Sequence, residues 1–238
     1  MRINKIKLII LAFLSITACN NTPKSNTTAV EIPKTEQKSE PVKEMTKATL
    51  DLTKYGIANN QNNVLGGLKV GDKAPDFKMM DQDGKSVNLE EIIEHGPVLM
   101  VFLRAEWCSY CVRHLKEFQD NLQDLHDAGN VKVVAVSPQQ TSYMQKFHKE
   151  NQFAYPILYD EDHSVMKDYK VFFHVTDRYN DYIEKAKGER IEVFNGDTEP
   201  VMPVPATYLI GQDKTIKYVH YDPNYKKRSD INEVIAQL

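Results

Sequence analysis

Apolar residues follow two different periods along the C-terminal part of the chain. Residues 97–103 and 131–137 are continuous apolar runs of strand length, the pattern of strands covered on both faces. Between them, apolar residues recur in steps of three and four, which predicts a helix with one face packed on a sheet. The helical positions are Cys111, Leu115, Phe118, Leu122 and Leu125. Strand, helix and strand in this order predict a βαβ unit with parallel strands.

Shorter segments of the same kinds complete the predicted fold. The predicted strands are 157–159, 206–210 and 215–221, and the predicted helices are 143–151, 162–169 and 230–238. A βαβ unit followed by two strands and a helix is the order of the thioredoxin fold. We therefore expect an α/β protein of thioredoxin-like fold, with a central mixed β-sheet flanked by helices. An N-terminal hairpin around residues 81–84 and an insertion over roughly residues 160–203 would be added to it.

The N-terminus resembles an export signal. Basic residues precede an apolar stretch over residues 8–16 that is too short to span a bilayer. The sequence Ile-Thr-Ala-Cys that ends at Cys19 resembles a bacterial lipobox, in which the cysteine is lipidated and becomes the mature N-terminus. The alternative is a cysteine buried in a transmembrane helix.

Three regions follow from this interpretation. We expect residues 1–19 to be a lipoprotein signal peptide, residues 20–64 a flexible tether, and residues 65–238 one thioredoxin-like domain. The protein would lie outside the cytoplasm of a bacterium, on the periplasmic side or the cell surface, as a membrane-anchored lipoprotein.

Composition narrows the possible partners. The chain has 238 residues with 30 basic and 33 acidic side chains, a net charge of −3. It therefore has no broad positive field for nucleic acid. Its three cysteines, at positions 19, 108 and 111, are too few for a fold stapled by disulfides.

Cys108 and Cys111 form a C-x-x-C motif between a predicted strand and a predicted helix. Cys108 would lie at the first helical turn, where free backbone amides and the helix dipole favour a thiolate. We expect a lowered pKa to make Cys108 the nucleophile, while Cys111, three residues on, resolves a mixed disulfide. With Trp107 beside them, the two cysteines are predicted to cycle between dithiol and disulfide.

Metal or haem binding fits the same cysteines less well. Zinc needs about four ligands, and the only nearby imidazole, His114, is expected to be a solvated helix residue. Attached haem needs a histidine directly after the second cysteine, where Val112 stands. A copper(I) carrier stays open as an alternative, because thiolates bind this ion, and it would need His174 or His220 to face the pair. We expect no cofactor and no resident metal.

Three blocks of the chain resemble the peroxiredoxin-like branch of the alkyl hydroperoxide reductase and thiol-specific antioxidant (AhpC/TSA) family, within the thioredoxin superfamily. They are VGDKAPDF at 70–77, FLRAEWCSYC at 102–111, and VPATYLI at 204–210 with HYDPNY at 220–225. The third block resembles the family's C-terminal strands, and its start, within residues 202–207, resembles the cis-proline loop that faces the C-x-x-C helix in this superfamily. By that resemblance Pro205 is the cis-proline and Val204 lines a substrate groove; the alternative is a trans proline at the start of an edge strand.

The active-site block departs from the family pattern. Peroxiredoxins have the spacing P-x-x-x-T-x-x-C, which would place Arg104 at the proline, Cys108 at the threonine and Cys111 at the cysteine. Arg104 could steady a thiolate or a peroxide oxygen, or it could be a solvent-facing turn residue. Glu106 is the nearest possible proton acceptor.

The resemblance and the cysteine pair together predict a thiol-dependent oxidoreductase of antioxidant type, cycling Cys108 and Cys111 to reduce disulfides or hydroperoxides. A thioredoxin-dependent peroxiredoxin, a thiol peroxidase, is the first alternative, and a copper(I)-binding carrier of thioredoxin fold is the second. The expected partners are a thiol electron donor such as a thioredoxin-like protein, a disulfide or hydroperoxide substrate, and a membrane through lipidated Cys19. No nucleic acid is expected.

Overall fold

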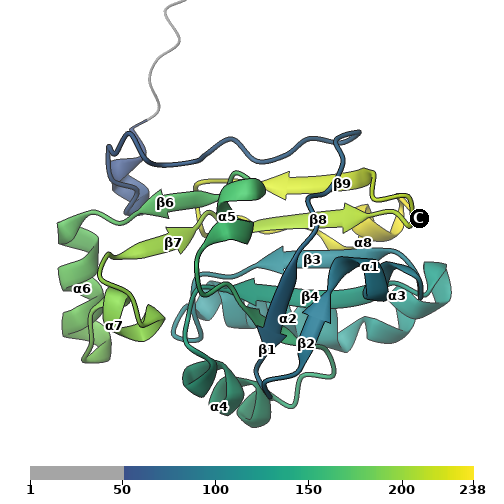
Figure 1. The fold of residues 1–238 in the computed structure, drawn as a ribbon, viewed down its shortest axis with the longest axis horizontal. Coiled ribbons are helices and arrows are strands. Elements are labelled where there is room, and N and C mark those ends of the chain that lie inside the picture. Colours follow the sequence, from purple (N-terminus) through teal and green to yellow (C-terminus); the bar gives the residue numbers. More distant parts are fainter. Residues whose placement is uncertain (1–50) are drawn as a thin grey trace, which may run out of the picture. The chain divides into compact units, whose positions relative to one another are not determined.

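The computed structural model describes residues 51–238, and a seven-stranded mixed sheet forms its centre (Figure 1). Its strands are β1 (Lys78–Asp81), β2 (Ser86–Asn88), β3 (Val98–Phe102), β4 (Lys132–Ser137), β5 (Ile157–Tyr159), β8 (Ala206–Ile210) and β9 (Ile216–Tyr221). They follow the order β2-β1-β5-β4-β3-β8-β9. β3, β4 and β5 run parallel to one another, and the other pairs are antiparallel. The predicted mixed sheet and its N-terminal hairpin of β1 and β2 are confirmed.

β3 is the strand that leads into the cysteine motif. All its residues are buried, as its continuous apolar run predicts for a strand covered on both faces. Val98, Met100 and Phe102 belong to one core cluster, whereas Leu99 and Val101 belong to the cluster on the other face. β3 is therefore held from both sides, and its C-terminal end is a fixed platform for the turn that follows.

Helices cover the face of the sheet that carries Leu99 and Val101. They are α2 (Ser109–Asp120), α3 (Leu122–Gly129), α4 (Thr141–Asn151) and α8 (Ile231–Ile235). The single helix predicted from residues 111–125 is two helices, because Asn121 leaves the helical conformation at φ −111° and ψ 18°. Its side-chain amide donates to the backbone oxygen of Glu117 at 2.7 Å. The apolar period continues across this break, since Phe118 and Leu125 pack in the same cluster.

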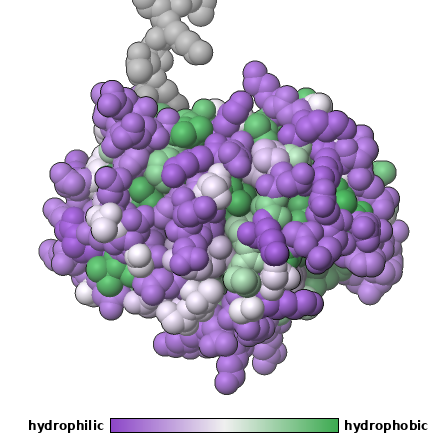
Figure 2. All heavy atoms as spheres, viewed as in Figure 1, coloured by the Kyte–Doolittle hydropathy of each residue, from purple (hydrophilic) through white to green (hydrophobic). Residues whose placement is uncertain are grey.

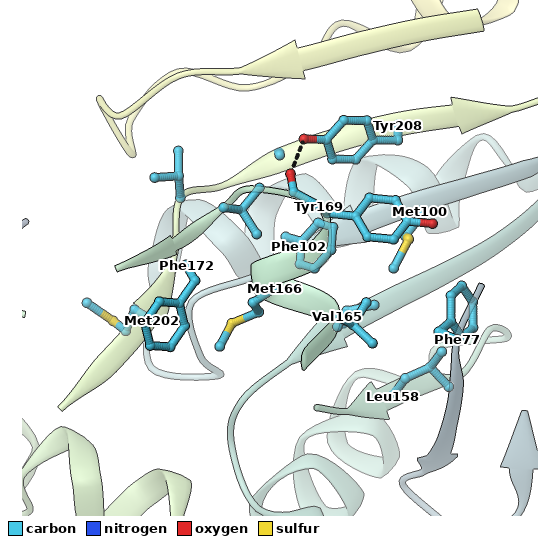
Figure 3. Close-up of a cluster of buried hydrophobic side chains, with 14 of the residues drawn as sticks. Phe77, Met100, Phe102, Leu158, Val165, Met166, Tyr169, Phe172, Met202 and Tyr208 are labelled. Atoms are coloured by element: carbon cyan, nitrogen blue, oxygen red, sulfur yellow. Dashed lines mark hydrogen bonds between the residues drawn. The ribbon is translucent and has the colours of Figure 1, made fainter. Parts of the chain in front are cut away.

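The insertion covers part of the opposite face. After α1 (Leu89–Ile93) on that face, the insertion adds α5 (Ser164–Asp168), β6 (Phe172–His174), α6 (Asp177–Lys187), α7 (Ile191–Asn195) and β7 (Val201–Pro203). β6 and β7 pair antiparallel as a separate two-stranded sheet, which lies with α6 and α7 at one end of the molecule (Figure 1). Figure 3 shows the core that joins the insertion to the sheet, where Tyr208 donates to the backbone oxygen of Tyr169 at 3.1 Å. Phe102 packs against both tyrosine rings.

Residues 51–64, which we expected to be tether, pack on the domain instead. A short 3-10 helix (Thr53–Tyr55) precedes Ile57, whose side chain is 1% exposed. The backbone amides of Ala58 and Val64 donate to the backbone oxygens of His174 and Phe172, which belong to the insertion. These apolar and backbone contacts extend the ordered domain toward the N-terminus.

Two further expectations concern the membrane. The signal peptide and Cys19 lie outside the described residues. Within residues 51–238, no helix combines the length and the apolar character needed to cross a bilayer. On the face of the molecule in Figure 2, hydrophilic residues predominate and apolar residues are scattered in small groups.

Candidate functional site: a buried cysteine pair at the start of α2

The two cysteines meet at the N-terminus of α2, just beyond the end of β3. Cys108 is the N-cap residue, with an extended backbone at φ −84° and ψ 100°, and its carbonyl accepts from the backbone amides of Cys111 and Val112. The two sulfur atoms lie 2.8 Å apart, within hydrogen-bond distance. Both thiols are free, and the residues are only 5% and 2% exposed. The start of the helix therefore brings together the two sulfurs that are predicted to cycle between dithiol and disulfide.

The two thiols ionise as a coupled pair. The hydrogen bond with Cys111, together with burial, raises the pKa of Cys108. Burial also opposes ionisation of Cys111, but its hydrogen bond with Cys108 and the positive charges of Arg228 and Arg104 outweigh burial and lower its pKa to about 6. The pair thus loses one proton readily and keeps the other. The lowered pKa expected for Cys108 is therefore a property of the pair, because the two sulfurs share one hydrogen bond and the pair titrates as a unit.

Two arginines supply the positive charge near the sulfurs. Arg228, in the loop after β9, donates from Nη2 to the sulfur of Cys111 at 3.5 Å. Arg104, in the turn after β3, is 2% exposed, which excludes the solvent-facing alternative. None of its three guanidinium nitrogens has a hydrogen-bond partner in residues 51–238. Its charge reaches both cysteines and favours their ionised forms.

Aromatic rings surround the Arg104 guanidinium. The ring centroids of Trp107, Tyr179 and Tyr225 lie 5.8, 4.8 and 4.3 Å from its central carbon. Tyr179 comes from α6 in the insertion, and Tyr225 comes from the same loop as Arg228. We call Trp107, Tyr179 and Tyr225 the aromatic cage. Segments far apart in the sequence thus meet around one buried cation.

Glu106 and Trp107 form the rest of the turn before Cys108. Burial raises the pKa of Glu106, and its Oε2 atom is buried without a hydrogen-bond partner. The Trp107 ring also packs against Phe194 of α7, with centroids 6.4 Å apart. Trp107 therefore connects the cysteine turn to the insertion, and Glu106 stays a candidate proton acceptor.

Val204 and Pro205 lie beside the same turn. Ala206 pairs with Phe102 in the antiparallel register of β8 and β3, which places the preceding residues next to the chain that leaves β3. Val204 is fully buried and its backbone amide donates to Val171 at 2.7 Å. Its side chain therefore belongs to the core and does not line an open groove, contrary to our expectation.

His114 is buried, which corrects its expected place on the solvated side of α2. It is 4% exposed, and its Nε2 lies 2.8 Å from the hydroxyl of Ser229, which donates to the hydroxyl of Thr207 at 3.1 Å. Burial lowers the pKa of His114 to about 3, so it is neutral near pH 7. It packs on Phe118, with ring centroids 4.4 Å apart. The helix stripe that faces the sheet thus includes a polar residue.

The structure brings neither histidine of the copper hypothesis into a metal cluster. His174 is bonded to Asn63 and, through Nε2 at 3.0 Å, to Glu199. His220 has a buried Nε2 without a partner. Across residues 51–238, no group of three or more His, Cys, Asp and Glu side chains is arranged to hold a metal ion.

Three residues of the site could not be assigned from the sequence. Arg228 ends a basic run after the block at 220–225, and Tyr225 is the last residue of that block. Tyr179 lies in the insertion, where no motif points to the cysteines. The nearest signal was the third family block, which resembles C-terminal strands of the family and gives the loop after them no role.

Comparison with known proteins agrees with the predicted fold and family. The sequence profile of the AhpC/TSA family matches residues 70–219. Peroxidoxin BcpB from Mycobacterium tuberculosis, a solved structure, is 21% identical and superposes with a TM-score of 0.55 over 71% of this chain and 96% of its own. The structure is therefore of the thioredoxin-like class found in peroxiredoxins. Since the profile covers more than half of the sequence, the chain belongs to the AhpC/TSA family.

Curated relatives are named peroxiredoxins. Peroxiredoxin Bcp of Escherichia coli is 32% identical over 105 residues, which are 44% of this chain and 66% of the relative. Chloroplastic peroxiredoxin Q of Oryza sativa subsp. japonica is 26% identical over 175 residues, 74% of this chain and 69% of the relative. The chain thus spans slightly less than two thirds of the Escherichia coli protein.

Proposed function

We propose that this protein is a thiol-dependent oxidoreductase that reduces a hydroperoxide with Cys108 and Cys111 and is returned to the dithiol by a thiol donor. The observation that carries the proposal is the pair of free sulfurs 2.8 Å apart at the N-terminus of α2, with guanidinium groups beside them. Membership in the AhpC/TSA family and similarity to peroxiredoxins support a hydroperoxide as the oxidant. A thioredoxin-like protein is the proposed donor.

Cys108 is the proposed nucleophile because it caps the helix and is the more exposed of the two. As Cys108 attacks the peroxide, its proton passes to the Cys111 thiolate. A sulfur–oxygen bond forms, the oxygen–oxygen bond breaks, and the leaving alkoxide takes the proton from Cys111. The products are a sulfenic acid on Cys108 and an alcohol.

Cys111 completes the proposed cycle. Its thiolate attacks the Cys108 sulfur, the disulfide forms, and hydroxide leaves as water after taking a proton from solvent. One hydroperoxide is thereby reduced by two electrons from the pair. Arg104 and Arg228 offset the negative charge that remains on the pair before this step.

Thiol–disulfide exchange is the second candidate. It is favoured by the position of Cys108, which stands where the family pattern has a threonine, so the hydroxyl that would hold a peroxide is replaced by a thiol. In this case Cys108 attacks a substrate disulfide, and Cys111 resolves the mixed disulfide and takes over the bond.

Single-cysteine variants test the proposal. With hydrogen peroxide or an organic hydroperoxide, Cys111→Ser should accumulate a sulfenic acid on Cys108, whereas Cys108→Ser should react slowly, as followed by stopped flow and mass spectrometry. A sulfenic acid formed on Cys111 at the wild-type rate would reverse the two roles. If the reduced wild-type chain turns over a small disulfide faster than either peroxide, exchange replaces peroxide reduction as the function.

We also propose that the protein works outside the cytoplasm, tethered by lipid at Cys19. The proposal is supported by the lipobox-like sequence that ends at this residue. A tether of charged and polar residues would let the domain reach soluble donors while staying near a membrane.

A further inference from the structure

Arg104 is a buried cation without an anionic partner. Its three guanidinium nitrogens are inaccessible, and none finds a hydrogen-bond acceptor in the part of the chain that is described. A buried charge in this condition is costly, and proteins rarely keep one unless it is paired. The position of Arg104 beside the redox pair therefore needs a physical reason.

The aromatic cage compensates this charge only in part. Ring faces attract a cation through their quadrupole, and three of them lie within 6 Å of Arg104. The rings are neutral. Burial raises the pKa of Tyr179, although the nearby Arg104 guanidinium acts in the opposite direction. The attraction of the rings is thus the same in the disulfide and the dithiol. Among the groups around Arg104, the cysteine pair is the one whose charge changes with oxidation.

Within residues 51–238, no carboxylate forms an ion pair with Arg104 or Arg228. Arg228, the second cation, contacts Cys111. Burial lowers the pKa of both His114 and His220, so these two imidazoles are mainly neutral near pH 7. Asp222, in the same loop, is paired with Lys227 at 3.0 Å. Glu106, whose pKa burial raises, has no bond to either arginine.

We propose that Arg104, assisted by Arg228, makes the Cys108–Cys111 disulfide easy to reduce, so that the pair has an oxidising reduction potential. The proposal rests on the proposed redox cycle of this pair. The disulfide takes up two electrons and one proton, its sulfur–sulfur bond breaks, and one thiol and one thiolate form. The two cations face no anion in the disulfide and gain one on reduction. Arg104 does not contact a substrate in this proposal. Its charge stabilises the thiolate of the reduced pair.

An oxidising reduction potential limits which compounds can oxidise the cysteine pair. A pair that is easily reduced is a poor reductant of ordinary disulfides, whereas a hydroperoxide is a much stronger oxidant and can still oxidise it. A thiol donor then restores the dithiol with little difficulty. The structure therefore favours a hydroperoxide over a protein disulfide as the substrate that oxidises Cys108 and Cys111.

The reduction potential of the full chain tests this proposal. Equilibration with glutathione and glutathione disulfide should show that Arg104→Met stabilises the disulfide at least tenfold, equivalent to a potential lower by about 30 mV. Arg104→Lys, which keeps the charge, should stay closer to the wild type. The matched control is Arg113→Met, which removes an exposed cation stacked on Tyr110 of the same helix and should leave the potential unchanged.

The proton count gives a second readout. At a pH above the first pKa of the cysteine pair, reduction of the wild-type disulfide should take up one proton. The reduction potential should then change by about 30 mV per pH unit. In Arg104→Met the first pKa should be higher, so reduction near neutral pH should take up two protons and the slope should approach twice that value. An unchanged potential in Arg104→Met would overturn the proposal. If that variant does not fold, Arg228→Met serves, and an unchanged potential there would overturn the charge-balance argument. Neither measurement uses peroxide, so a failed peroxidase assay leaves this test intact.

Discussion

Asp160 should make the stability of the domain fall as the pH rises through the mildly acidic range. This buried carboxyl lies where β5 leads into the insertion, and it accepts from the backbone amides of Val165 and Met166 at 3.2 and 2.8 Å. Burial raises its pKa from 3.8 to about 6, despite these two bonds. The unfolded chain therefore ionises first, and each pH unit between the two values favours it over the folded state.

The size of the effect follows from the two pKa values. Their difference is about 2 units, and each unit is worth 1.36 kcal/mol, so roughly 3 kcal/mol of stability should be lost between about pH 4 and pH 6. The contribution is fully present below the unfolded pKa and lost as the pH passes the folded pKa. This is a large part of the total stability of a typical domain.

Urea unfolding of the wild type and of Asp160→Asn at several pH values measures this loss. The amide cannot ionise, so the free energy of unfolding of the variant should shift by roughly 3 kcal/mol in its favour, relative to the wild type, as the pH rises through this window. Asp162→Asn is the matched control in the same loop. The pKa of Asp162 is lowered, chiefly by the side-chain hydrogen bond with Ser164, so both of its states are ionised in this window. Asp162→Asn should therefore run parallel to the wild type between about pH 4 and pH 6 and diverge, in the opposite direction, only below about pH 4. Parallel stability curves for the wild type and Asp160→Asn would refute the argument.

Two further predictions concern the loop after β9 and the N-terminus. Arg228→Met should raise the first pKa of the cysteine pair, because it removes the cation 3.5 Å from the Cys111 sulfur. Thiolate absorbance during a pH titration measures this pKa. The control Lys227→Met, which breaks only the ion pair with Asp222, should leave the pKa near the wild-type value. Cys19→Ser should release the protein from membranes without changing its redox activity, and a variant that stays with membranes after a carbonate wash would rule out the lipid anchor.

The strands at the centre of the sheet could be predicted because each is buried on both faces. Burial on both faces leaves a continuous apolar run with little ambiguity, as at 97–103 and 131–137. The helix break at Asn121 left no such mark, because the apolar stripe continues through it. The apolar period predicted which residues pack against the sheet. It did not predict the local backbone conformation at Asn121, where one helix ends and the next begins.

The cysteine pair could be predicted for a similar local reason, whereas its electrostatics could not. Strand, turn, C-x-x-C and helix lie within one short segment, so their geometry follows from the chain itself. The charge around the sulfurs depends on Arg228 and Tyr179, which reach the site only through the fold. Cys108 also behaves differently from a cysteine alone at a helix N-terminus, because Cys111 is close enough to share its proton.

The insertion contributes to the site in a way that its position in the sequence conceals. It brings Tyr179 of α6 over Arg104 and Phe194 of α7 against Trp107. Its own shape is held by Arg190, which pairs with Asp181, Glu184 and Glu192 at 2.9, 3.1 and 2.7 Å. Without the insertion the Arg104 guanidinium would lose one wall of its aromatic cage and become accessible to water, which screens charge far more strongly than a protein interior does. The insertion therefore strengthens the field that the cysteine pair experiences, and the thioredoxin-like core provides the geometry on which that field acts.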